Sequence, residues 1–230
     1  MIHLKAISLS QREQLQGMGY LLFQFLVLPY VLSYLNTLLP HALSEVQLNF
    51  LFYCINFIAV ILIFRRFLGS SLQGLKRGCG TALEFAVLGL CGYFLCNFLL
   101  SFLIRKLFPA FSNVNDSTVL AMYRSAPFLM TVGTVVLVPL TEECLFRVLI
   151  FRRLYGASRP AAYLLSIFLF GFIHIMGYWG EVPPLTLVLC FIQYIPAGVF
   201  LAWAYQKGGN IFSSVLMHAC INALGIYLLR

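Results

Sequence analysis

Charged residues are scarce in this 230-residue chain: Asp, Glu, Lys and Arg make up 10% of it. A soluble domain carries about a quarter. Acidic side chains are the rarest, with 7 Asp and Glu against 15 Lys and Arg. Hydrophobic residues reach 61%, and the mean hydropathy is +0.92. This composition excludes an ordinary soluble domain and predicts an integral, multi-pass membrane protein.

Several well-known patterns are also missing. The seven cysteines show no C-x-x-C spacing, and the chain has no H-E-x-x-H motif. No soluble stretch carries a basic stripe interleaved with stacking aromatics, so the sequence gives no support for a nucleic-acid partner. No internal repeat or low-complexity linker separates domains. We therefore expect one membrane domain over residues 1–230.

Long apolar runs indicate the membrane spans. A helix needs about 20 residues to cross a ~30 Å hydrocarbon core. The sequence therefore predicts an all-α, polytopic helix bundle with about seven transmembrane helices. An eighth span stays open because Pro139 should kink its helix and free the carbonyl of Val135. The predicted spans are residues 18–39, 48–68, 81–104, 127–151, 160–177, 184–205 and 211–229.

The basic residues predict an orientation. If the N-terminus is cytoplasmic, eleven Lys and Arg residues lie on or toward the cytoplasmic side. The other four, Arg105, Lys106, Arg124 and Arg230, then lie on the opposite side. This sidedness explains the net charge of +8 without a nucleic-acid partner.

Polar side chains interrupt the apolar runs of the second half in three clusters. An ionisable group at membrane depth costs roughly 2.5 to 3.5 kcal/mol on insertion scales, so such residues are seldom there without a function. If Arg152, Arg159 and Lys207 mark the cytoplasmic interface, a rise of 1.5 Å per residue places the clusters ~15 to ~22 Å from it. All three should thus share one layer near the bilayer centre. The clusters are Glu142-Glu143-x-x-x-Arg147, Phe170-x-x-x-His174 and His218-x-x-x-Asn222.

Helical spacing assigns faces within these clusters. Glu143 and Arg147 are four residues apart, which predicts an ion pair along one face. Glu142 is rotated from them by about 100° and is left free for chemistry. His218 and Asn222 are also four apart and should point into one space. Each cluster alone is equally compatible with polar contacts between helices.

Together the clusters supply what peptide hydrolysis requires: a base for water, donors for the oxyanion and a proton for the leaving amine. We assign Glu142 as the general base and His174 as the group that holds the attacking water. His218 and Asn222 are the expected oxyanion donors. Phe170 lies one turn from His174 and is expected to wall the cavity.

At these residues the chain resembles the CPBP family, which contains the CAAX proteases and bacteriocin-processing (Abi) enzymes. All seven motif positions match, and the resemblance covers residues 127–229, while residues 1–106 share only hydrophobicity and are read as accessory spans. The resemblance implies an intramembrane endopeptidase that cuts near the cytoplasmic side. It also allows as substrates prenylated CAAX C-termini, bacteriocin leader peptides or other peptides that reach the lipid bilayer. Our mechanism for Glu142 calls for no cofactor, with zinc as the alternative.

Three alternatives stay open. Zinc held by His174 and His218 with Glu142 or Glu143 would make a metalloprotease, although the amide of Asn222 suits a metal poorly. A bacteriocin-immunity or scaffold protein would use the same residues without catalysis. A proton-coupled transporter is a third possibility, but the two halves lack the repeated broken helices typical of such proteins.

Overall fold

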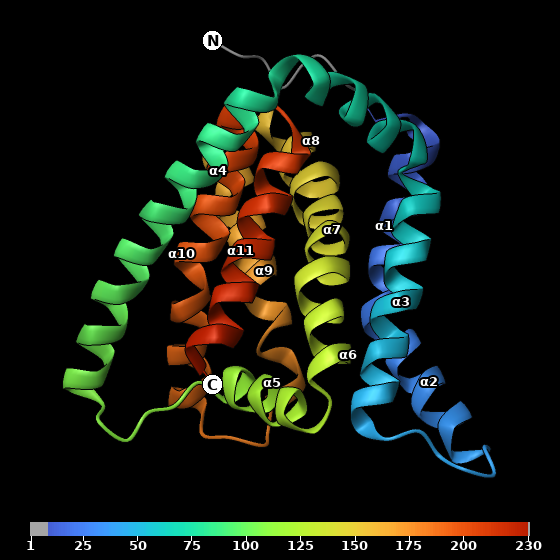
Figure 1. Ribbon diagram of the computed structural model, residues 1–230, viewed down its shortest axis with the longest axis vertical. Coiled ribbons are helices and arrows are strands. Elements are labelled where there is room, and N and C mark those ends of the chain that lie inside the picture. The colour runs from blue at the N-terminus through green and yellow to red at the C-terminus, as the bar shows by residue number, and fades with distance from the viewer. Residues whose placement is uncertain (1–8, 230) are drawn as a thin grey trace.

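A computed structural model describes residues 9–229 and confirms the all-α prediction, with no strand in that range. Figure 1 shows the helices gathered into one bundle, with α5 lying across its lower end. The α-helices are α1 (Gln11–Leu26), α2 (Leu28–Thr37), α3 (Glu45–Ile63), α4 (Arg65–Leu107), α5 (Val114–Ser125), α6 (Pro127–Thr131), α7 (Val138–Glu143), α8 (Arg152–Tyr155), α9 (Arg159–Ile173), α10 (Pro184–Gly208) and α11 (Ile211–Leu229). Two π-helical segments, η2 (Val132–Leu137) and η3 (Cys144–Phe151), and one 3-10 turn, η4 (Met176–Tyr178), complete the elements.

Four of these helices, α3, α4, α10 and α11, are long and apolar enough to cross a membrane. The pair α1 and α2, bent by 47°, makes a fifth span if its two halves are counted together. The seven predicted runs are largely helical, but four of them are not single long helices. Residues 18–39 bend between α1 and α2, and residues 48–68 run from α3 across a break at Phe64 into α4. Residues 127–151 are divided by π-helical turns, and α9 has only 15 residues, about 22 Å. The predicted count of seven is therefore not reached by length and composition alone.

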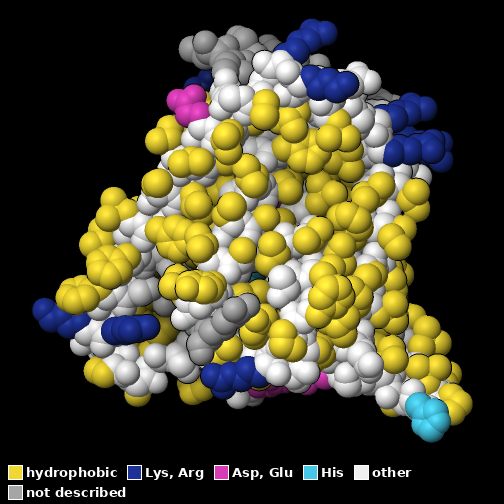
Figure 2. All heavy atoms as spheres, viewed as in Figure 1, with side chains coloured by type: hydrophobic (Ala, Val, Ile, Leu, Met, Phe, Trp, Pro, Cys, Tyr) yellow, Lys and Arg dark blue, Asp and Glu magenta, His cyan; other side chains and the backbone are white. Residues whose placement is uncertain are grey.

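Helix α4 changes direction at Gly78, whose backbone (φ −119°, ψ 16°) is not helical. Figure 1 shows its first part crossing the upper end of the bundle before the second part descends along one side. In Figure 2, hydrophobic side chains cover most of the visible face, and Lys and Arg side chains gather toward the ends. This distribution, with large apolar side chains exposed along α4, is that of a membrane protein.

The centre of the bundle is η3, in which all eight residues are buried. Helices α9, α10 and α11 and the N-terminal helix α1 pack around it. Because η3 directly follows Glu142 and Glu143, the two glutamates are attached to a helix that is buried along its whole length.

Two glycines allow close packing among the N-terminal helices and against η2. A methyl group on Gly133 would lie 2.6 Å from a ring carbon of Tyr53 on α3. A methyl group on Gly17 of α1 would lie 2.7 Å from Phe64. Both approaches are too close for a larger residue, since real Cβ atoms essentially never come within 3.0 Å of a neighbour. The first two predicted spans are thus packed on the elements that carry and flank the acidic cluster, α1 on η3 and α3 on α7 and η2.

Candidate active site

The acidic cluster lies between two π-helical segments. In η2 the Val138 amide donates to the Gly133 carbonyl, five residues back. The next residue is Pro139, which has no amide hydrogen, so the carbonyl of Thr134 loses its partner in this register. The side-chain amide of Asn222 donates to that carbonyl at 2.7 Å. The proline does free a carbonyl as predicted, but it is that of Thr134, because the helix is π-helical there.

The predicted ion pair is present. Arg147 Nε lies 3.2 Å from Glu143 Oε2, and neither side chain is exposed. The Arg147 guanidinium also lies 4.7 Å from the ring centre of Phe170, and its Nη1 is 3.5 Å from the Ser166 hydroxyl. A buried guanidinium stays charged, so Glu143 serves as its counterion.

His218 contacts both glutamates. Its Nδ1 lies 3.0 Å from Glu143 Oε1, and its Nε2 lies 3.9 Å from Glu142 Oε2. A carboxylate accepts, so Nδ1 donates to Glu143, and Nε2 is the atom turned toward Glu142. This arrangement joins the last helix to the acidic cluster and holds the imidazole in one orientation.

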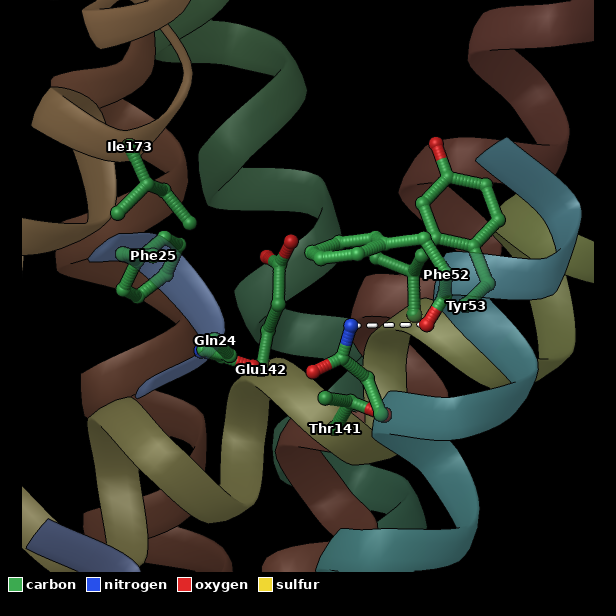
Figure 3. Close-up of a pocket in the computed structure, with 9 residues that line it drawn as sticks. Gln24, Phe25, Phe52, Tyr53, Thr141, Glu142 and Ile173 are labelled. Atoms are coloured by element: carbon green, nitrogen blue, oxygen red, sulfur yellow. Dashed lines mark hydrogen bonds between the residues drawn. The ribbon is translucent and has the colours of Figure 1, made fainter. Parts of the chain in front are cut away.

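Glu142 differs from its neighbour in access. Its side chain is 17% exposed, whereas that of Glu143 is fully buried. It lines a cavity of about 60 Å³ bounded by α1, α3, α7 and the end of α9. Figure 3 shows its carboxylate rising between Phe25 and Ile173 on one side and Phe52 and Tyr53 on the other. Its Oε2 accepts no hydrogen bond from the described residues. The prediction that Glu142 faces away from the ion pair is confirmed.

His174 follows the last residue of α9. Its Nδ1 is 2.7 Å from the Phe170 carbonyl, which can only accept, so Nδ1 carries a hydrogen. In the neutral ring, Nε2 then has a free lone pair. The ring stacks on Tyr194 with centroids 4.3 Å apart, and Tyr194 is in turn bonded by Asn115 of α5 at 2.8 Å.

Phe170 packs between the two histidines, with ring centres 4.8 Å from His174 and 5.7 Å from His218. It is 2% exposed and does not line the cavity, so its part is to space the imidazoles rather than to wall a pocket. Among residues 9–229, no hydrogen bond or ion pair joins His174 or Asn222 to Glu142. The structure thus brings both glutamates, Arg147 and His218 into direct contact and links His174 through Phe170.

The donor set does not fit a zinc site in this arrangement. Within the described residues there is no group of three His, Cys, Asp or Glu side chains that could hold a metal ion.

Sequence reasoning missed three contributors: Gln24, Asn115 and Tyr194. Gln24 is a polar residue inside an apolar run, the same kind of signal that marked the three clusters. Tyr194 follows Gln193 in the run 184–205, and Asn115 lies in the longest polar connection. None has a motif partner at helical spacing, so periodicity alone gave no reason to select it.

Comparison with known proteins finds a family that is similar to the segment carrying this site. Residues 124–224 match the family described as type II CAAX prenyl endopeptidase Rce1-like. The matched segment is similar to that family and makes up less than half of the chain. It contains all three polar clusters, so the predicted resemblance is confirmed over the part of the chain that carries the site.

A curated relative is similar over a shorter range. The UPF0177 protein YxdF of Lactococcus lactis subsp. lactis (strain IL1403) is 33% identical over 90 residues, which are 39% of this chain. The chain spans about 44% of that relative's length. No solved structure matches.

Proposed function

We propose that this protein is an intramembrane endopeptidase in which Glu142 activates the water that attacks a peptide bond. The observation that carries the proposal is the unequal environment of the two adjacent glutamates. Glu143 is bonded to Arg147 and His218, whereas Glu142 lines the cavity and its Oε2 accepts no hydrogen bond from the described residues. A general base must be within reach of water and have an oxygen free to accept its proton.

Charge balance assigns the state of His218. Two carboxylates and one guanidinium leave one negative charge in a buried cluster, and an imidazolium at His218 would neutralise it. Its Nδ1–H then donates to Glu143, and its Nε2–H is the donor directed toward the reacting atoms. This makes His218 the principal oxyanion donor, held in place by Glu143.

The reaction follows from these positions. Glu142 takes a proton from water, and the resulting hydroxide adds to the substrate carbonyl carbon. The negative charge thus moves from the carboxylate to the carbonyl oxygen, where His218 Nε2–H and the second N–H of Asn222 stabilise it. When the carbon–nitrogen bond breaks, Glu142 returns its proton to the leaving amine. The Nε2 lone pair of His174 accepts a hydrogen bond from the water and orients it.

The proposed substrate is a peptide or protein segment that reaches the membrane, either prenylated or a bacteriocin leader, and the proposed orientation has a cytoplasmic N-terminus. The first residues and Arg230, which contribute to that orientation, lie outside the described residues. No cofactor is required in this scheme.

Three single variants separate catalysis from a binding or scaffold function: Glu142→Gln, His174→Ala and Asn222→Ala. Each is produced at wild-type abundance and assayed for the protein's cellular activity. The proposal expects all three to lose it. An activity that survives all three at normal abundance has another basis, such as immunity or scaffolding. Glu181→Gln, which changes an exposed loop glutamate, is the matched control.

A further inference from the structure

The cavity beside Glu142 has a second polar wall, contributed by Gln24 of α1. Gln24 is only 4% exposed, yet its side chain lines the cavity together with Glu142 (Figure 3). Helix α1 lies outside the Rce1-like segment, so this contact comes from the part of the chain that the family match does not cover.

The neighbouring polar groups of this cavity are already bonded. Asn56 donates to the Phe52 carbonyl at 2.8 Å and accepts from the Tyr20 hydroxyl at 2.7 Å. The Thr141 hydroxyl donates to the Leu137 carbonyl at 3.0 Å. Asn56 therefore joins α1 to α3, the Thr141 hydroxyl is satisfied within its own helical run, and neither group needs a ligand.

Gln24 has no such partner. Among residues 9–229, no hydrogen bond is made by its carboxamide. A buried amide without a partner is costly, and native structures keep one where a ligand or water completes it. The Gln24 amide thus lines the cavity together with the Glu142 carboxylate, whose Oε2 also has no hydrogen-bond partner among the described residues.

The chemistry of the two groups indicates what completes them. A carboxamide offers both a donor and an acceptor, as does a peptide group, so the two can pair in both directions. The rest of the lining is mainly apolar, with Phe25, Phe52, Val138 and Ile173. A cavity of about 60 Å³ has room for a few water molecules or a small apolar side chain.

We propose that Gln24 binds the main chain of the substrate next to the scissile bond, with the adjacent apolar wall receiving a small side chain. This inference rests on the proposed function and assigns the N-terminal helices α1 and α3 a direct part in substrate binding. Gln24 would bind the substrate equally well in the ground state and in the transition state. Its loss should therefore raise KM more than it lowers kcat.

The test replaces Gln24 with Met, which has similar length and no hydrogen-bonding head. Gln16→Met, on the exposed face of the same helix, is the matched control. Membranes of cells that produce wild type, Glu142→Gln, Gln24→Met or Gln16→Met at equal abundance are compared by mass spectrometry for uncut peptides. A peptide that accumulates with Glu142→Gln is then synthesised and added to the purified proteins in lipid vesicles.

We expect Gln24→Met to raise KM about ten-fold, equivalent to about 1.4 kcal/mol, with little change in kcat. Its melting temperature should equal or exceed that of wild type, because no internal hydrogen bond is lost. Gln24→Asn keeps the amide on a side chain shorter by one methylene, so its KM should lie between those of wild type and Gln24→Met. Gln16→Met should behave as wild type.

The outcomes are distinguishable. If Glu142→Gln processes peptides as wild type does, the proposed function is wrong and this inference falls with it. If Glu142→Gln is inactive while Gln24→Met has wild-type KM, the inference alone is wrong. A lowered melting temperature for Gln24→Met would show a structural role and would also overturn it.

Discussion

His218 Nδ1 lies 3.0 Å from Glu143 Oε1, in a pair that is buried on both sides. This contact spans 75 residues of sequence and ties the last helix to the acidic cluster. The two adjacent glutamates thus have different surroundings. Glu143 holds His218 and Arg147, whereas Glu142 lines the cavity.

The first prediction follows from that separation. Glu143→Gln leaves Arg147 as an uncompensated buried charge, which should cost roughly 3 to 5 kcal/mol and lower the melting temperature and abundance. Glu142→Gln removes a partly exposed acid with one unbonded oxygen, so it should leave stability nearly unchanged. Thermal denaturation in detergent compares the two. Equal losses of stability would show that the two glutamates are not functionally distinct.

Asn222 has a structural role, its bond to the Thr134 carbonyl, and a proposed catalytic role. Replacing Pro139 allows the two roles to be measured separately. Asn222→Ala should leave the Thr134 carbonyl unpaired, at about 1 to 3 kcal/mol. It should also lower turnover by about 100 to 1,000-fold through loss of an oxyanion donor.

In a Pro139→Ala background the helix regains an amide hydrogen that can serve the Thr134 carbonyl. The stability cost of Asn222→Ala should then shrink, while the loss of turnover should persist. A turnover that recovers together with stability would assign Asn222 a structural role only.

Gly133 permits the close approach of α3 to η2, the segment that leads into Glu142. In Gly133→Ala the new methyl group would lie 2.6 Å from Tyr53, so Tyr53, which lines the cavity, must move. Overpacking of this kind costs typically about 1 to 3 kcal/mol. We expect a lower melting temperature and reduced processing. Gly225→Ala on α11, which meets nothing within 4 Å, is the control and should be neutral or mildly stabilising.

A metal-independent mechanism makes a further prediction. Purified protein treated with a chelator should retain its processing activity, and metal analysis should find no stoichiometric zinc. Activity that is lost on chelation and restored by zinc would instead favour the metalloprotease alternative and would require rearrangement of the histidines.

The local part of this site was predictable from the sequence. The spacing of Glu143 and Arg147 fixes their ion pair, and the rotation between adjacent residues turns Glu142 away, because both depend only on helical geometry. The apolar runs likewise fixed the helical class.

The long-range part was not predictable. The π-helical register that frees the Thr134 carbonyl depends on how the helix packs, and the His218 contact with Glu143 depends on tertiary structure. Gln24 lies more than a hundred residues from Glu142 in the chain, so no periodic pattern relates them. The short α9 reflects a helix that ends at Ile173, four residues before the predicted end of its span.

The central claim is that Glu142 performs peptide hydrolysis in the membrane, and the most direct test compares membrane peptides from cells with wild-type protein, Glu142→Gln and the control Glu181→Gln at equal abundance. We expect defined uncut species to accumulate only with Glu142→Gln, and their cleaved products to appear with the other two proteins. Identical peptide profiles for all three would contradict the claim.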